Sequence, residues 1–176
     1  MKSLLFDVYY RFYDKFMSIF KLDEHQAIVS RVKIYAGNRR LKIADIGGGT
    51  GLLANTLIGL GHEVTIIDPA KKMTAIAQKL NPQVMIINQT LENTTPERTY
   101  DVIILRDCLH HIKAQAEALG KIFEILQDNG LLIIQEFSPD CISAKCLFQF
   151  ERCCWEKVYP IPPSELVLMM TEADFI

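Results

Sequence analysis

The chain has 176 residues, of which 49% are hydrophobic and 23% are charged, and its formal net charge is −2. This length and mixture predict a single globular domain and exclude disordered and fibrous proteins. The near-neutral charge also argues against a broad nucleic-acid-binding surface, which needs clustered lysine and arginine. Because no apolar run approaches the length that spans a bilayer, we expect neither a nucleic-acid nor a membrane partner.

The chain has 5 cysteines, four of them between residues 141 and 154 and the fifth, Cys108, far away in the sequence. Their spacing lacks the paired C-x-x-C pattern of structural metal sites. Free thiols in a reducing cytoplasm are therefore the expected state, and we expect no metal site.

Helical and strand-like stretches alternate along the chain, as is typical of an open parallel α/β sheet. The apolar spacing and stop signals predict helices over residues 4–19, 25–35, 49–60, 70–80 and 114–126. Apolar β-branched runs predict strands over residues 41–46, 63–68, 83–88, 100–107 and 131–137. A turn is expected at 128–130, ahead of the last strand. We therefore expect a doubly wound, Rossmann-like, mostly parallel sheet flanked by helices, with its ligand beyond the carboxyl ends of the strands.

A glycine-rich loop, "GGGTG", follows the first predicted strand and opens the first crossover helix. Glycine lets the backbone approach a ligand closely, and the helix N-terminus offers unpaired N–H donors. Residues 49–54 fit the G-x-G-x-x-A pattern of dinucleotide binding, whereas S-adenosylmethionine uses an acidic residue followed by x-G-x-G-x-G. The glycines alone leave both cofactors open.

Two aspartates stand at the ends of the first two predicted strands. Asp45 would face the loop, where its charge would repel a pyrophosphate but favour the ammonium and sulfonium groups of S-adenosylmethionine. Asp68 could accept hydrogen bonds from both ribose hydroxyls, which either cofactor carries. The sign of the charge at Asp45 thus favours S-adenosylmethionine.

Five stretches in order, "ADIGGGTG", "VTIIDPAKKM", "INQTLENT", "YDVIILRDCLHHI" and "ILQDNGLLIIQEF", resemble the successive motifs of the class I S-adenosylmethionine-dependent methyltransferases. The resemblance is to the small-molecule branch that contains the quinone-biosynthesis C-methyltransferases, whose entry helix is similar to "FDVYYRFYDKF". It extends from Phe6 to Phe175 and implies a methyltransferase that acts on a small-molecule acceptor, with S-adenosylmethionine as cofactor and no metal.

The resemblance also implies which residues bind the cofactor. Gly47, Gly49 and Gly51 would line its methionine and ribose parts, Asp45 would reach its amino end and Asp68 would hold the ribose.

Further along, Pro69 or Met73 would pack on the adenine. Gln89 stands where the family usually has an aspartate that accepts from the adenine amino group, and Thr90 follows it in the same cofactor-binding motif.

Arg106 stands near the mouth of the site, where a small residue is commoner in the family. It could pair with Asp107 or with an anionic substrate, and the local pair is favoured because it needs no further partner.

The chemistry implied is an in-line displacement at the sulfonium methyl group, in which alignment and exclusion of water can supply much of the acceleration. A general base is therefore not obligatory. Where the acceptor must lose a proton, the candidates are Tyr13, His110, His111 and Glu136. A histidine that fills the core is an equally good reading of His110 or His111.

Within one domain, we expect a helical cap (1–36), a cofactor-binding core (37–138), a cysteine- and aromatic-rich substrate cap (139–163) and a last helix (164–176). The cap aromatics could instead pack on the edge of the sheet. The family's final antiparallel hairpin is missing from the pattern, so the edge of the fifth strand should be covered by the cysteine-rich segment or paired in a homodimer. Two alternatives stay open: a non-catalytic cofactor-binding or regulatory module, and an NAD-dependent oxidoreductase.

Overall fold

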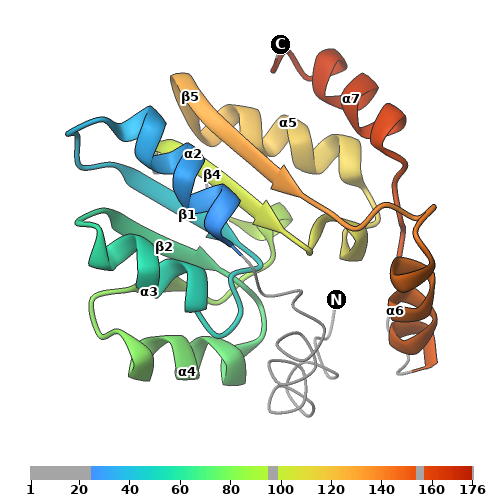
Figure 1. Cartoon of the computed structure of the whole chain (residues 1–176), viewed down its shortest axis with the longest axis horizontal. Helices are drawn as coiled ribbons and strands as arrows, with labels where there is room; N and C mark the ends of the chain where they lie inside the picture. Colours follow the sequence, from blue (N-terminus) through green and yellow to red (C-terminus); the bar gives the residue numbers. More distant parts are fainter. Residues whose placement is uncertain (1–24, 95–98, 154–156, 176) are drawn as a thin grey trace.

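The computed structural model describes residues 25–94, 99–153 and 157–175 and has a parallel sheet between two layers of helices (Figure 1). The strands are β1 (Lys42–Ile46), β2 (Glu63–Ile67), β3 (Met85–Ile87), β4 (Tyr100–Arg106) and β5 (Leu126–Gln135). Their order in the sheet is β3-β2-β1-β4-β5, and every neighbouring pair is parallel. The expected doubly wound, Rossmann-like sheet is confirmed.

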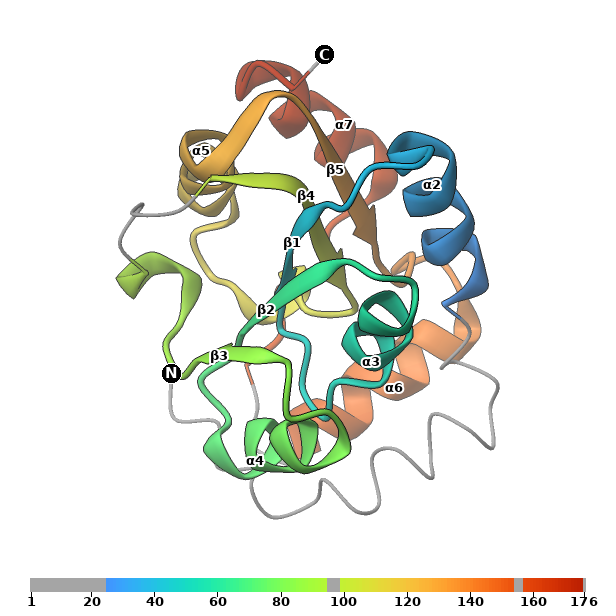
Figure 2. The same ribbon diagram turned by 90° about the vertical axis from the view of Figure 1, so that its left-hand side faces the viewer.

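Helices cover both faces of this sheet. They are α2 (Gln26–Ala36), α3 (Leu52–Gly59), α4 (Lys71–Leu80), α5 (Gln115–Ile125), α6 (Ile142–Cys153), α7 (Pro163–Glu172) and the 3₁₀ turns η1 (Leu91–Asn93) and η2 (Leu109–His111). Core side chains of α2, α3 and α4 pack with one face of the sheet, and those of α5 and α7 pack with the other (Figures 1 and 2).

Strand β4 shows why these residues form a central strand. Val102 and Ile104 belong to the core on the α2–α3 side, whereas Ile103 and Leu105 belong to the core on the α5 side. All four are fully buried because successive side chains of a strand point to opposite faces and both faces are covered by helices. The continuous apolar run in the sequence thus has a direct structural cause.

The expected elements agree with the observed ones to within a few residues at each boundary. One expectation was wrong: residues 128–130 lie inside β5, which starts directly after α5. The left-handed backbone of Asn129 (φ 60°) occurs there together with a shift in the pairing of β5 with β4. The turn-forming residues therefore make an irregularity in the strand. The helix expected over residues 4–19 lies outside the described residues.

Strand β5 is one edge of the sheet and pairs with β4 alone among the described strands. After it the chain continues into α6 and α7, and the described part contains no further strand. Leu131 and Ile133 of β5 pack with the core on the α2 side, and Leu132 and Ile134 with the core on the α5 side. Among the described helices, none is long and apolar enough to cross a membrane.

Candidate functional site

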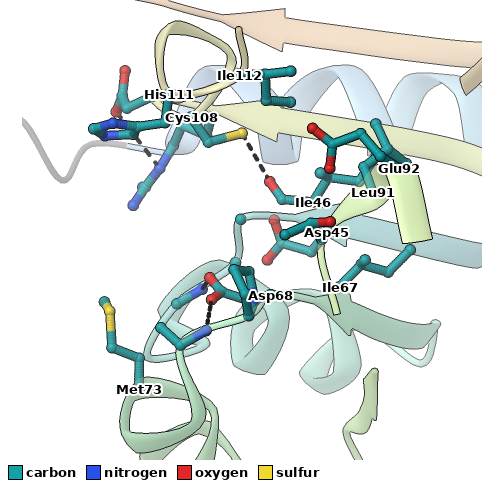
Figure 3. Close-up of a pocket in the computed structure, with 18 of the residues that line it drawn as sticks. Asp45, Ile46, Ile67, Asp68, Met73, Leu91, Glu92, Cys108, His111 and Ile112 are labelled. Atoms are coloured by element: carbon teal, nitrogen blue, oxygen red, sulfur yellow. Dashed lines mark hydrogen bonds and ion pairs between the residues drawn. The ribbon is translucent and has the colours of Figure 1, made fainter. Parts of the chain in front are cut away.

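A cavity of about 500 Å³ opens beyond the carboxyl ends of β1, β2 and β4, within the usual size range of small-ligand sites. Figure 3 shows side chains from the ends of these strands and from the following turns directed toward it. Its wall includes the sequence-predicted residues Asp45, Gly47, Gly49, Asp68, Pro69, Met73, Thr90, Arg106 and His111. The expected position of the site at this edge of the sheet agrees with the position of the cavity.

The glycine loop forms one side of this cavity between β1 and α3. Gly47 and Gly49 have left-handed backbones, with φ of 71° and 53°. At Gly47 a Cβ atom would also lie 2.6 Å from the Cβ of Cys108, closer than any real side chain tolerates. Gly47 is therefore required by both its backbone conformation and the packing of the loop against the residues that follow β4.

Gly51 is not part of the cavity wall, although it was assigned to the cofactor. It precedes α3 with φ 77°, and a Cβ atom there would lie 2.7 Å from the Cβ of Ala77 on α4. The structure accounts for this glycine by close packing of α3 and α4, which is one of the known uses of a glycine in such loops.

Asp45 lies one residue before the end of β1 and faces the cavity (Figure 3). Its side chain is 2% exposed, and its Oδ2 has no hydrogen-bond partner within the protein. Burial raises the pKa of this carboxyl to about 7; the charge of Arg106 opposes the rise and that of Asp68 adds to it. A buried, unsatisfied carboxylate at a cavity wall is suited to binding a positively charged ligand group.

Asp68 follows β2 and fastens the glycine loop. Its Oδ2 accepts a hydrogen bond from the Gly49 N–H (3.0 Å), and its Oδ1 accepts one from the Ala70 N–H (2.7 Å). Each carboxylate oxygen has a second lone pair for a ligand hydroxyl. Pro69 and Met73 continue the same wall into α4.

The far wall comes from the residues after β3. Thr90 lines the cavity with Leu91, Glu92 and Asn93 of η1, whereas Gln89 is exposed and is not part of the wall. Motif position suggested that Gln89 contacts the adenine, but after β3 it is the following residues, from Thr90 on, that line the cavity. Sequence reasoning did not assign Leu91, Glu92 and Asn93 to the site. The available signal was that they belong to the stretch "INQTLENT".

The favoured pairing of Arg106 with Asp107 is present. The guanidinium Nε lies 3.9 Å from Asp107 Oδ2, and both residues line the cavity. Burial raises the pKa of Asp107 to about 7, and the nearby Glu136 carboxylate contributes to the rise. At this distance the ion pair is weak.

Glu136, which follows β5, is not at the cavity wall. Its carboxylate accepts hydrogen bonds from the backbone N–H groups of Cys108 (2.8 Å) and Leu109, and it lies 2.6 Å from His110 Nδ1. Glu136 and His110 therefore stabilise the turn after β4 and lie outside the cavity wall. Burial opposes the charged ring of His110, but its hydrogen bond to Glu136 and the nearby Glu151 carboxylate raise its pKa to about 9.

His111 does line the cavity, unlike its neighbour His110. Burial and the nearby charge of His110 lower the pKa of His111 to about 4. The fourth predicted catalytic residue, Tyr13, lies outside the described residues.

The segment 139–163 contributes Lys157 and Tyr159 to the cavity wall, next to Cys108, Ile112 and Lys113. The Tyr159 N–H donates to the carbonyl of His110 at 2.7 Å, which holds the segment against the turn after β4. Lys157 and Tyr159 belong to the predicted cap, whereas sequence reasoning did not assign Cys108, Ile112 or Lys113 to the site.

The cap aromatics divide between two roles. Tyr159 lines the cavity, as expected for a cap, whereas Phe148 is buried against Ala144 and Val158. Phe150 is 52% exposed.

Comparison with known proteins identifies the family. The model of the family described as "Methyltransferase domain" matches residues 15–175. A ubiquinone biosynthesis O-methyltransferase from Rickettsia typhi is 29% identical over 112 residues, which are 61% of this chain and 46% of that protein. The chain spans about half the length of the curated relatives it matches.

Two solved structures show the same fold. A S-adenosylmethionine-dependent methyltransferase from Thermotoga maritima superposes with a TM-score of 0.75 at 20% identity, covering 96% of this chain and 78% of that one. The magnesium protoporphyrin IX methyltransferase from Synechocystis, solved with bound S-adenosylhomocysteine, gives 0.65 at 21% identity, covering 84% and 71%. Since the family model covers nearly all of it, the chain belongs to the methyltransferase-domain family, among the class I S-adenosylmethionine-dependent methyltransferases.

Proposed function

We propose that this chain binds S-adenosylmethionine in the cavity beyond β1, β2 and β4 and catalyses methyl transfer to a small-molecule acceptor. The observation that carries the proposal is Asp45, whose buried Oδ2 has no partner and faces a cavity bordered by the glycine loop. In the same wall, Asp68 has acceptor capacity for ribose hydroxyls. The family match favours this cofactor over the dinucleotide that the glycine pattern also allowed.

The proposed roles follow from the positions of the side chains. Asp45 binds the cationic end of the cofactor, and Asp68 binds the ribose. Pro69 and Met73 on one wall and Leu91 on the other enclose the adenine with apolar surface. Thr90, with its hydroxyl in the same wall, completes the adenine end.

The cofactor supplies an electrophilic methyl group on a sulfonium. The chain's contribution is to hold the two reactants in line and to exclude water, which can account for much of the acceleration. Of the four predicted proton acceptors, His111 is the described residue that reaches the cavity, and we place it next to the acceptor. His110 and Glu136 act by positioning the turn after β4.

The acceptor side has an apolar body and a basic rim. Cys108, Ile112 and Tyr159 supply the apolar surface, and Lys113 and Lys157 are exposed at its edge. We propose an acceptor with an apolar or aromatic body and an acidic or hydroxyl group. Because two of the curated relatives are named ubiquinone biosynthesis and malonyl-[acyl-carrier protein] O-methyltransferase, we propose oxygen as the methylated atom. A screen of matched phenols, carboxylic acids, amines and thiols by mass spectrometry tests this, and methylation of amines or thiols alone would refute it.

Two finer proposals concern the state of the protein. The four described cysteines are unpaired, which supports a reducing compartment such as the cytoplasm. The edge of β5 supports a homodimer in which two copies cover this edge. Sedimentation of the full chain tests the dimer, and a monomer at all concentrations would refute it.

The binding function is tested by calorimetric titration of the full chain with S-adenosylmethionine and S-adenosylhomocysteine. We expect one site per chain for each ligand. If circular dichroism shows that the chain is folded and neither ligand gives a heat of binding, the proposal is refuted.

A further inference from the structure

Four buried titratable side chains meet between the turn after β4 and the helix α6. His110 and His111 belong to η2, Glu136 follows β5, and Glu151 lies on α6. His110 is 1% exposed, Glu151 4% and His111 8%. Methyl transfer by alignment does not require such a cluster, so its presence needs another physical explanation.

The ligand atoms in this cluster point toward one another. His110 Nε2 lies 3.6 Å from Glu151 Oε2, and His111 Nε2 lies 3.8 Å from Glu151 Oε1. A ligand atom from each of the three residues lies within 4.8 Å of the others. Both nitrogen–oxygen distances are too long for good hydrogen bonds. They are close to the separation of about 3.4 Å between two atoms that are each about 2.1 Å from one tetrahedral cation.

The other ring nitrogen of His110 has a protein partner of the kind that metal-binding histidines use. His110 Nδ1 is bonded to Glu136 Oε2 at 2.6 Å. Such outer partners fix the tautomer and orientation of a metal-binding imidazole. In this structure Glu136 orients His110, and the Nε2 atoms of both rings lie near Glu151.

Two atoms at the centre of the cluster are unsatisfied. His110 Nε2 and Glu151 Oε2 are buried and have no hydrogen-bond partner within the protein. Burying such groups without a partner is costly. A cation between them would satisfy both atoms and would balance the two glutamates.

We propose that His110, His111 and Glu151 bind one divalent transition-metal ion of the zinc class, with Glu136 as the residue that orients His110. Two imidazoles and a carboxylate are a donor set that zinc accepts, with one coordination position left for water or another ligand. The ion would fasten α6 to the turn that carries the cavity residues Cys108 and His111. The sequence analysis predicted no metal site from the spacing of the cysteines. The site proposed here contains no cysteine.

The site does not depend on the proposed transferase function and can be tested separately. Full-length protein is freed of metal with a chelator and titrated with Zn²⁺ in a calorimeter. We expect one tight site, lost in Glu151→Gln and weakened by roughly 10–100-fold in Glu136→Gln. Glu117→Gln, which changes an exposed glutamate of α5, is the matched control and should bind as wild type does.

Among the described residues, the exposed thiols that could compete for zinc are Cys141, Cys146 and Cys153. A variant with all three changed to serine should keep the tight site. Circular dichroism checks each fold, and thermal unfolding should show a zinc-dependent rise in Tm that Glu151→Gln lacks. If Glu151→Gln fails to fold, the visible absorption of Co²⁺ bound to wild type and its loss in His111→Gln replace it. No stoichiometric site, a site unaffected by Glu151→Gln, or a site lost with the cysteines would overturn the proposal.

Discussion

The Asp68 carboxylate accepts a hydrogen bond from the Gly49 backbone N–H at 3.0 Å, and so links the end of β2 to the glycine loop after β1. The other carboxylate oxygen accepts from the Ala70 N–H at 2.7 Å. This link holds the glycine loop against the end of β2. It also leaves lone pairs on the same oxygens for a ribose.

Asp68→Asn should therefore weaken S-adenosylmethionine binding by at least about tenfold, because an amide nitrogen cannot accept one of these two N–H bonds and leaves a buried donor unpaired. Calorimetry measures the loss. Asp101→Asn is the matched control: Asp101 also accepts a backbone N–H, from Lys42 at 2.7 Å, but is not part of the cavity wall. Equal effects of the two changes would show that Asp68 acts only on the fold.

Gly47→Ala should lower the free energy of unfolding by at least about 2 kcal/mol, because alanine is strained at positive φ and its Cβ would meet Cys108. Gly59→Ala, on α3 with nothing within 4 Å of the added atom, should be neutral or stabilising by about 0.4–1 kcal/mol. Urea unfolding of both variants provides the comparison. A Gly47→Ala protein as stable as Gly59→Ala would contradict the described loop conformation.

Affinity for the cationic cofactor should depend on pH through Asp45. Its pKa of about 7 means that the carboxyl is largely protonated below neutrality, and the ionised form is the one that attracts a cation. We expect affinity to fall by roughly tenfold per pH unit as the pH drops below 7, with Asp101→Asn showing the same slope. Asp45→Asn should bind weakly and without this slope. A wild-type affinity that is constant through this range would refute the role of Asp45.

Asp45 should also lower the stability of the ligand-free protein at high pH. A carboxyl whose pKa is raised by folding contributes its full stability below the ordinary value of 3.8 and loses it as the pH rises through about 7. Asp45→Asn stays neutral, so it should exceed wild type by roughly 2–4 kcal/mol near pH 8 and match it only when the pH falls below the ordinary value of 3.8. Denaturant unfolding at the two pH values is the measurement. A variant less stable than wild type at both would show that Asp45 is satisfied in the folded protein.

The fold and the nearer half of the site could be predicted because their signals are local in sequence. Apolar runs indicated the strands, and Asp45 and Asp68 are at the cavity because each lies within one residue of the end of a strand whose carboxyl end opens there. The glycine pattern could not separate Gly49, which lines the cavity, from Gly51, which packs against α4. That distinction depends on which atoms lie next to each glycine in the folded protein, and these come from segments distant in the sequence.

The farther half of the site depends on contacts between distant segments. Tyr159 reaches the cavity through its N–H bond to the His110 carbonyl, and no periodicity in the sequence reports that contact. Glu136 was predicted as a catalytic candidate because a carboxylate at the end of an apolar strand is costly to bury unless it has a function or a partner. In the structure the partners are the backbone N–H groups of Cys108 and Leu109, which donate hydrogen bonds to Glu136 from 28 and 27 residues away in the sequence.

The central claim, that the cavity beside Asp45 binds S-adenosylmethionine, is tested most directly by titrating the wild-type chain with S-adenosylmethionine and, separately, with NAD. We predict one site for S-adenosylmethionine, greatly weakened in Asp45→Asn, and no binding of NAD, whose pyrophosphate the buried carboxylate would repel. Binding of NAD without S-adenosylmethionine, or cofactor binding that is as tight in Asp45→Asn as in wild type, would contradict the claim.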